Sequence, residues 1–257
     1  MVNKRILLIV AAVTAVTIGI LYWSDARVDF NKEKGAADIR EEEATYFDGV
    51  SGFFVRPADD GEYPGVVMVH EWWGLNDSIR NEARELAKEG YMVLAVDLYK
   101  GEVATTPDRS QELVRRVVKE EAVDNMRSAV AYLRDKGALK IASLGWCFGG
   151  GKSLELALSG EELDATVIYY GQLVTDANEL KKISWPVLGV FGEEDASIPV
   201  ATVEAFRSGL VEAGVVNEIY IYPGVGHAFA NPTGNNYSPE ETEDAWNKTR
   251  SFLKNNL

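Results

Sequence analysis

From Thr45 to Leu257 the chain alternates short apolar segments with longer amphipathic ones. Short, almost entirely apolar runs are typical of strands buried on both faces of a parallel sheet, whereas apolar residues repeating at about 3.6 positions predict helices. The predicted strands are 65–70, 91–98, 141–146, 165–170, 186–191 and 218–222. The predicted helices are 76–89, 108–136, 153–158, 200–213 and 239–255. This alternation predicts an α/β fold with a mostly parallel, doubly wound sheet and helices on both faces.

The segment Tyr46 to Val55 predicts a hairpin ahead of this pattern. Asp48-Gly49 supplies the turn signal, because these residue types tolerate the positive φ angles of tight hairpin turns, and Pro57 ends the second strand. The sequence contains no internal repeat and no second domain boundary. We therefore expect one globular domain, residues 45–257.

The N-terminal segment has a different character. Ile6 to Trp23 is a run of eighteen residues without a charged side chain, about the minimum length for a helix that spans a bilayer. Lys4 and Arg5 precede it, and such a basic flank predicts a cytoplasmic N-terminus. We expect an uncleaved transmembrane helix within residues 1–23, with a cleaved signal segment as the alternative, followed by a charged tether over 24–44. Either way, we expect the domain outside the cytoplasm, membrane-anchored or secreted.

Charge and composition narrow the classes of partner and cofactor. The 257-residue chain has a net charge of −14 and a pI of about 4.7, so nucleic acids and anionic membrane surfaces are poor partners. Its single cysteine excludes an internal disulfide and a metal site built from cysteines, and its two histidines argue against a histidine-rich metal centre. We therefore expect no metal and no cofactor, and a small molecule as substrate or ligand.

The cysteine lies in the pattern Gly145-x-Cys147-x-Gly149, between a predicted strand and a glycine-rich helix start. This is G-x-S-x-G with cysteine in place of serine, a sharp strand-to-helix turn that exposes the side chain at its apex. Glycines are needed because Cβ atoms on either side would collide across the turn. The helix N-terminus beyond the apex favours negative charge, so it should stabilise a thiolate and an oxyanion. We interpret Cys147 as a nucleophile; a small buried hydrophobic residue is the alternative.

An acid and a base follow later predicted strands. Asp195 lies in the loop after the fifth predicted strand, where Glu193 and Glu194 are competing acids. His227 follows the last predicted strand in a glycine-rich loop. The order nucleophile, acid, base along the chain is that of the α/β-hydrolase fold. We therefore predict that Cys147, Asp195 and His227 form a catalytic triad.

The segment Glu71-Trp72-Trp73 follows the first of the predicted parallel strands. A loop at this place in the fold supplies a backbone N–H to the oxyanion. A carboxylate beside two tryptophans is either solvated at the surface or partly desolvated, and we favour the desolvated carboxylate, whose protonation its surroundings would tune. His70 ends the preceding strand, and we interpret it as structural.

Together these motifs resemble the dienelactone hydrolases (carboxymethylenebutenolidases), a branch of the α/β-hydrolase superfamily with a cysteine nucleophile. The motifs are His70–Gly74, Asp97-Leu98-Tyr99, Gly145–Gly150, Gly192–Asp195 and Gly226–Phe229, and the resemblance covers residues 45–257. It implies an α/β-hydrolase fold with Cys147, Asp195 and His227 as the triad.

The resemblance also implies roles for residues around the triad. Glu71 would contact the resting thiol and help to form the thiolate when substrate arrives. The backbone amides of Trp72 and Phe148 would form the oxyanion hole. The residues expected to bind substrate are Trp73, Tyr99, Lys100, Phe229 and Asn231.

Two departures from the family pattern concern the substrate. The resemblance implies two arginines that hold a substrate carboxylate, but Gly101 and Asn231 occupy these positions here, with Lys100 one residue before the first. We therefore expect a hydrolase that cleaves another ester or lactone through a thioacyl-enzyme. The alternatives are a small carboxylesterase or thioesterase, and a catalytically silent, tethered domain that binds a ligand or partner.

Overall fold

The computed structural model of the chain describes residues 38–257. The membrane anchor or signal segment expected over residues 1–23 lies outside this range, as do residues 24–37 of the expected tether. Among the helices formed by residues 38–257, none has the length and apolar character needed to cross a bilayer.

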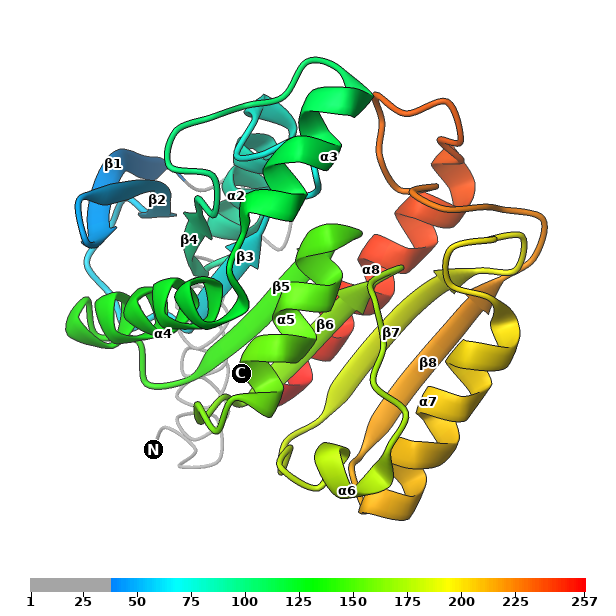
Figure 1. The fold of residues 1–257 in the computed structure, drawn as a ribbon. Coiled ribbons are helices and arrows are strands. Elements are labelled where there is room, and N and C mark those ends of the chain that lie inside the picture. Colours follow the sequence, from blue (N-terminus) through cyan, green and yellow to red (C-terminus); the bar gives the residue numbers. More distant parts are fainter. Residues whose placement is uncertain (1–37) are drawn as a thin grey trace, which may run out of the picture. The chain divides into compact units, whose positions relative to one another are not determined.

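One mixed sheet organises residues 38–257 (Figure 1). Its strands are β1 (Ile39–Phe47), β2 (Val50–Pro57), β3 (Gly65–Val69), β4 (Met92–Val96), β5 (Ile141–Trp146), β6 (Ala165–Tyr169), β7 (Val187–Gly192) and β8 (Asn217–Tyr222). They lie in the order β1-β2-β4-β3-β5-β6-β7-β8. β2 is antiparallel to both of its neighbours, and all other neighbouring pairs are parallel. The predicted mostly parallel sheet is therefore confirmed, with an antiparallel pair added at one edge.

Helices cover both faces of the sheet (Figure 1). They are α2 (Asp77–Lys88), α3 (Pro107–Arg116), α4 (Lys119–Asp135), α5 (Phe148–Leu158), α6 (Ala177–Leu180), α7 (Val200–Ala213) and α8 (Pro239–Asn256). Apolar side chains of α2 and α8 form one core cluster with the sheet, and those of α3 to α7 form a second. The strands β3 to β7 are buried along their whole length, which explains their continuous apolar runs.

The first hairpin has the predicted turn, but its first strand begins earlier than expected. Asp48 and Gly49 have φ angles of 36° and 78°, as a tight turn of two residues with positive φ requires. β1 begins at Ile39, so residues 39–44, which the sequence assigned to the charged tether, belong to this edge strand. The acidic run is exposed there, and Glu41 pairs with Arg84 of α2. β1 has a neighbouring strand on one side only, and charged side chains on such an edge strand discourage pairing with a strand of another molecule.

The long helix predicted over 108–136 is two helices. α3 ends at Arg116 and α4 begins at Lys119, because Val117 and Val118 have extended backbone conformations, with ψ of 117° and 130°. Two successive β-branched residues favour such a conformation over a helix. The break lets α3 and α4 follow different directions, and α4 packs against β1, β3 and β4 (Figure 1).

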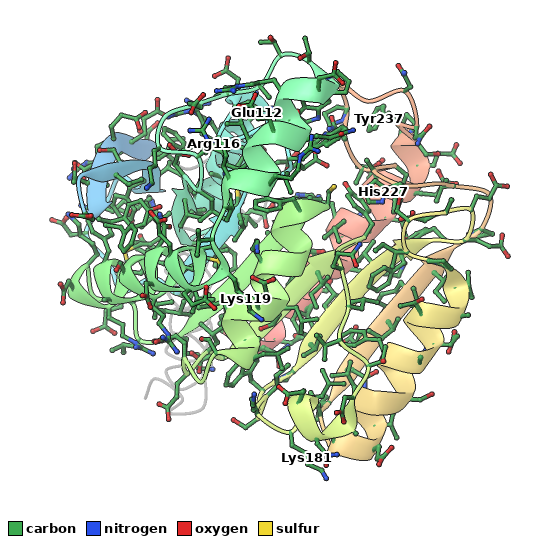
Figure 2. All side chains as sticks on the ribbon, in the orientation of Figure 1. Glu112, Arg116, Lys119, Lys181, His227 and Tyr237 are labelled. Carbon is green, nitrogen blue, oxygen red and sulfur yellow. The ribbon has the colours of Figure 1, made fainter. Side chains whose placement is uncertain are left out.

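The parallel strands place the predicted site residues at one edge of the sheet. The loops after the carboxyl ends of β3, β5, β6, β7 and β8 all lie there, where reactive groups gather in sheets of this kind. Figure 2 shows His227 among these loops, whereas Lys181, in the segment that leads into β7, lies at the opposite end.

Candidate active site

Cys147 stands at the apex of a strained turn between β5 and α5. Its φ and ψ are 52° and −116°, a conformation that non-glycine residues seldom adopt, and α5 begins at the next residue. A Cβ on Gly145 would lie 2.2 Å from the Gly149 carbonyl oxygen, and one on Gly149 would lie 2.3 Å from the Val69 carbonyl oxygen. Gly145 is therefore required by the tightness of the turn itself, as the sequence pattern predicted, and Gly149 by the packing of the turn against the end of β3.

The three residues of the predicted triad come together. The Nε2 atom of His227 lies 3.1 Å from Cys147 Sγ, and Nδ1 lies 2.7 Å from Asp195 Oδ2. The other carboxylate oxygen of Asp195 accepts hydrogen bonds from the backbone N–H groups of Ser197 and Ile198, at 2.8 and 3.0 Å. Asp195 is thus fixed from one side by its own loop and orients the imidazole from the other, which is the role of the acid in such a triad.

The charges of this trio stabilise one another. Burial lowers the pKa of His227, but its hydrogen bonds with Asp195 and Cys147 outweigh this effect and raise the pKa to about 10. Burial raises the pKa of Asp195, yet the hydrogen bond and the charge of His227 lower it below its ordinary value. The arrangement therefore favours an ionised aspartate and an imidazolium beside the sulfur, which is the state in which a cysteine reacts as a thiolate.

Two backbone N–H groups in the loops at this edge of the sheet have no backbone acceptor among the described residues. Phe148 is the first residue of α5, so its N–H has no acceptor within the helix. Trp72 lies in the loop after β3, and in residues 38–257 neither of these N–H groups donates to another backbone carbonyl. Both amides therefore stay the predicted donors of the oxyanion hole.

His70 and Tyr99 hold the loop that carries Trp72. Nε2 of His70 accepts a hydrogen bond from the N–H of Leu98, so Nδ1 carries the proton and donates to the carbonyl of Glu71, at 3.2 and 2.6 Å. The hydroxyl of Tyr99 donates to the Trp72 carbonyl at 3.2 Å. Burial lowers the pKa of His70, in agreement with a neutral ring. His70 is therefore structural, as predicted, and it positions the loop that carries the proposed oxyanion donor.

Glu71 contacts Asn231 rather than the thiol. The carboxylate is only 8% exposed and accepts a hydrogen bond from the side-chain amide of Asn231, which is 7% exposed. Thr233 fixes the orientation of this amide, because its N–H and its hydroxyl both donate to Asn231 Oδ1, at 2.9 and 2.8 Å. The amide nitrogen must then face Glu71. The resting contact between Glu71 and the thiol that the resemblance implied is thus replaced here, and Cys147 is paired with His227 instead.

Burial also changes the acidity of Glu71. It raises the pKa of this carboxyl to about 7, against the opposing effects of the His227 charge, the Asn231 hydrogen bond and the nearby Tyr170 hydroxyl. The sequence-based preference for a desolvated carboxylate is confirmed. Because the His227 charge acts on Glu71, the carboxyl belongs to the electrostatic surroundings of the triad.

Tyr170 is a site residue that the sequence analysis did not identify. Its side chain is 1% exposed, and within residues 38–257 its hydroxyl makes no hydrogen bond of standard geometry. Its ring centroid lies 5.3 Å from that of His227, and the charges of Glu71 and Cys147, after burial, raise the pKa of its hydroxyl. The available signal was its place directly after β6, at the same edge of the sheet as Cys147.

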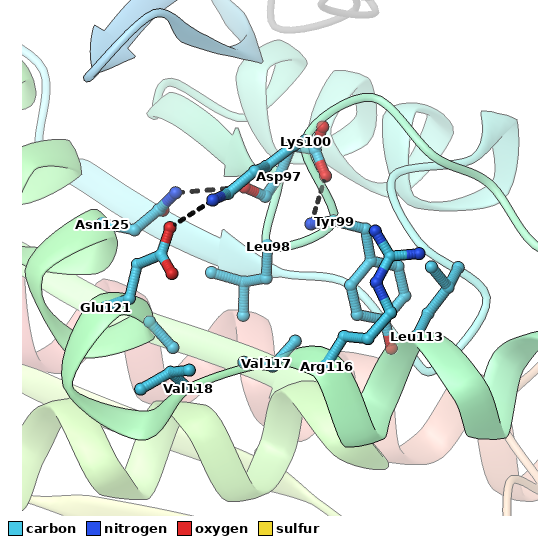
Figure 3. Close-up of a pocket in the computed structure, with 11 residues that line it drawn as sticks. Asp97, Leu98, Tyr99, Lys100, Leu113, Arg116, Val117, Val118, Glu121 and Asn125 are labelled. Atoms are coloured by element: carbon cyan, nitrogen blue, oxygen red, sulfur yellow. Dashed lines mark hydrogen bonds and ion pairs between the residues drawn. The ribbon is translucent and has the colours of Figure 1, made fainter.

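Lys100, expected at the substrate, has another partner. Its ammonium lies 2.6 Å from Glu121 of α4, and its side chain is 66% exposed. Figure 3 shows this ion pair at the rim of a hollow of about 190 Å³ that is also lined by Tyr99 and Arg116. Arg116 pairs with Glu102, at 2.9 Å. Lys100 and Arg116 are thus both paired with carboxylates of the protein, and neither pair involves a group that contacts Cys147.

Three other residues expected to bind substrate differ in their exposure. Trp73 is half-buried and packs edge-to-face with Trp72, so its ring can form part of a substrate wall. Tyr99 is buried and uses its hydroxyl within the Trp72 loop. Phe229 has no exposed surface and packs between Tyr170 and Tyr222. The expectation that Phe229 contacts substrate is therefore not met, because its ring packs in the core beneath the loop while Ala228 and Ala230 on either side are half-buried.

In residues 38–257, no group of three or more histidine, cysteine, aspartate or glutamate side chains is arranged to hold a metal ion. The arrangement at Cys147 brings a thiol, an imidazole and an orienting carboxylate together, which is a set suited to acyl transfer.

Comparisons with known proteins agree with this chemistry. The profile of the dienelactone hydrolase family matches residues 50–257. A protein assigned as a carboxymethylenebutenolidase in Saccharolobus solfataricus is 31% identical over 228 residues, with 74% of this chain and 88% of that protein covered.

Solved structures show the same similarity. One assigned as a dienelactone hydrolase from Klebsiella pneumoniae superposes with a TM-score of 0.76 at 30% identity, covering 83% of this chain and 98% of that one. A dienelactone hydrolase-like promiscuous phosphotriesterase from metagenomic libraries gives a TM-score of 0.77 at 25% identity, covering 86% and 99%. The predicted α/β-hydrolase fold is therefore confirmed.

Proposed function

The chain is a hydrolase of the dienelactone hydrolase family, and from this premise we propose that it cleaves an ester or lactone through a thioacyl-enzyme at Cys147. The observation that carries the proposal is the contact of His227 Nε2 with Cys147 Sγ at 3.1 Å, with Asp195 on the other ring nitrogen. A nucleophile, a base and an orienting acid in this order of contact support nucleophilic catalysis.

In the first half-reaction, the Cys147 thiolate attacks the carbonyl carbon. A carbon–sulfur bond forms, and the carbonyl electron pair moves onto the oxygen, where the N–H groups of Trp72 and Phe148 stabilise it. Each such donor contributes about 3–4 kcal/mol to the transition state. As the tetrahedral intermediate collapses, the carbon–oxygen bond of the ester breaks and the His227 imidazolium protonates the leaving alkoxide. With a lactone, this alcohol stays attached to the acyl chain.

In the second half-reaction, His227 acts as a base. It takes a proton from water as the water oxygen attacks the thioester carbon, and the thiolate leaves when the carbon–sulfur bond breaks. Asp195 keeps the imidazole in place and stabilises its charged form in both steps. The products are the carboxylic acid and the regenerated pair of Cys147 and His227.

The location of this domain outside the cytoplasm is a separate part of the proposal. It is supported by the uncharged run Ile6 to Trp23 behind Lys4 and Arg5, and it includes a membrane-anchored or a secreted form. Carbonate extraction of cell membranes, combined with protease treatment of intact cells, tests it. Protein that is protected from the protease and absent from the secreted fraction would contradict the proposal.

The reaction itself is tested with p-nitrophenyl acetate, simple lactones and a thioester, on wild type and on Cys147→Ala. We expect turnover of an ester or lactone by wild type, and a loss of at least about 10³-fold in kcat/KM in the variant. The thermal unfolding curve of the variant should match that of wild type, which separates lost chemistry from lost structure. Unchanged turnover in Cys147→Ala would contradict the mechanism. Preference for the thioester would identify the thioesterase alternative, and no turnover of any substrate the silent binding domain.

A further inference from the structure

We propose that this site selects uncharged esters or lactones and discriminates against substrates that carry a carboxylate near the scissile bond, and that Glu71, held by Asn231, sets this selectivity. The inference rests on the proposed function, because it names the class of substrate that the triad accepts. It concerns a property of the site, its charge, that can also be measured without hydrolysis.

Glu71 is a fixed feature of the site rather than a mobile side chain. Asn231 donates to its carboxylate, and the amide of Asn231 is itself held by two donors from Thr233. The carboxyl is 8% exposed, so solvent cannot screen its charge effectively. Its charge interacts with the imidazole of His227, which contacts Cys147 Sγ. Above pH 7, where Glu71 is ionised, a fixed negative charge therefore acts on the imidazole that contacts the reacting sulfur.

No cation in the described part of the chain offsets this charge through a direct contact. The partner of Glu71 is the neutral amide of Asn231, and the cation that acts on it, His227, is already paired with Asp195 and the sulfur. Lys100 is committed to Glu121 on the outer surface (Figure 3). With Cys147 as thiolate, the site holds the negative charges of Glu71, Asp195 and the sulfur against one imidazolium.

The titratable groups facing Glu71 come from different elements. They are His227 in the loop after β8 and Tyr170 directly after β6, whereas Cys147, which follows β5, acts on Tyr170 and contacts His227. Tyr170 and Asn231 are neutral. An incoming carboxylate would thus meet an unscreened like charge at short range, which disfavours its binding and its approach to the thiolate.

The donors that are free in this site suit an uncharged ester. The Tyr170 hydroxyl is buried without a hydrogen bond in the described residues, and the N–H groups of Trp72 and Phe148 donate to no backbone carbonyl there. A buried donor without a partner is costly until something accepts from it. The oxygens of an ester or lactone can accept from these groups and bring no charge that Glu71 would repel.

Alkylation of Cys147 measures this selectivity directly, because it is the only cysteine in the chain. In the reaction the thiolate displaces iodide from iodoacetamide or from iodoacetate: a carbon–sulfur bond forms, the carbon–iodine bond breaks, and iodide leaves. The two reagents differ in charge and little in size. The alkylation ratio is the rate constant for iodoacetamide divided by that for iodoacetate. Divided by the same ratio for the uncharged thiol 2-mercaptoethanol, it reports the charge around Cys147.

At about pH 8, where Glu71 is ionised, we expect wild type to favour iodoacetamide by about fivefold after this normalisation. Glu71→Gln should lower the ratio by about fivefold, to that of 2-mercaptoethanol, since the charges of Asp195 and the His227 imidazolium then offset each other. Glu62→Gln is the matched control. It removes the same unit of charge from an exposed loop that leads into the amino end of β3, away from the site, and should leave the ratio unchanged.

Hydrolysis gives the second measurement. Methyl butyrate and monomethyl succinate differ mainly by one carboxylate, and we expect kcat/KM to favour the uncharged ester by at least about tenfold. Asn231→Arg, which would pair with Glu71, should reduce this preference and also lower the alkylation ratio. A wild-type alkylation ratio equal to that of 2-mercaptoethanol, or equal ratios in Glu71→Gln and Glu62→Gln, would overturn the inference. Absence of hydrolysis with the alkylation ratios as expected would instead refute the proposed function.

Discussion

The carboxylate of Glu71 accepts a hydrogen bond from Asn231, while the sulfur of Cys147 lies 3.1 Å from the imidazole of His227. Cys147 and His227 form the pair that can react, whereas Glu71 and Asn231 hold each other in place. The thiol therefore does not depend on the arrival of substrate to reach its base. Glu71 acts on the reaction through its charge.

The buried carboxyl of Glu71 should make stability depend on pH. Its pKa is raised from 4.5 to about 7 by burial, so the folded state binds the proton more tightly than the unfolded state. The resulting stabilisation is fully present below pH 4.5 and is lost as the pH rises through 7. In Glu71→Gln this dependence disappears. We expect the free energy of unfolding of the variant to improve relative to wild type by about 3 kcal/mol between pH 4 and pH 8.

Urea unfolding at a series of pH values, followed by tryptophan fluorescence, measures this difference. Glu62→Gln serves again as the control, and its difference from wild type should stay constant across the same range. Equal pH dependence of Glu71→Gln and wild type would show that the carboxyl is ionised at little cost in the folded protein.

Removal of the Tyr170 hydroxyl should separate stability from activity. The hydroxyl is buried and makes no hydrogen bond of standard geometry in residues 38–257, so Tyr170→Phe removes a desolvated polar group without orphaning a partner. We expect the melting temperature to stay the same or rise, and kcat/KM for an uncharged ester to fall by about tenfold. Thermal unfolding and steady-state kinetics on the same preparation check both. Full activity would mean that substrate does not use this hydroxyl.

The turn at Cys147 gives a test of packing with a matched control. A Cβ on Gly149 would lie 2.3 Å from the Val69 carbonyl, whereas one on Gly151, two residues along α5, would first meet Gln172 at 3.3 Å. Gly149→Ala should cost more than about 3 kcal/mol of stability, because backbone would have to move. Gly151→Ala should change stability by less than about 1 kcal/mol, since alanine also favours the helix. Similar unfolding free energies for both variants would contradict this account of the turn.

The elements most accurately predicted from sequence were those with strong local signals. The fully apolar strands from Gly65 onward and the turn at Asp48-Gly49 appear where expected, because burial on both faces and positive φ leave clear patterns. The start of β1 was missed, since an acidic run on an exposed edge strand has the composition of a tether. The break at Val117–Val118 was missed because amphipathic periodicity continues on both sides of it.

In the site, chain order and motif spacing indicated Cys147, Asp195 and His227, but side-chain partners could not be read in the same way. Lys100 was expected at the substrate because of its position in the motif, and its ion pair with Glu121 depends on how α4 packs. The contact between Asn231 and Glu71 joins residues 160 positions apart. Such contacts are set by the tertiary structure, and no local pattern encodes them.

The most direct measurement of the role of Cys147 is the detection of its acyl intermediate. Wild type mixed with p-nitrophenyl acetate and quenched in acid within the first turnover should carry one acetyl group on the peptide that contains Cys147, and hydroxylamine should remove it. His227→Gln should acquire this label at least about 10²-fold more slowly. An unlabelled Cys147 in protein that turns over, together with hydrolysis that persists after iodoacetamide has blocked the thiol, would contradict the account.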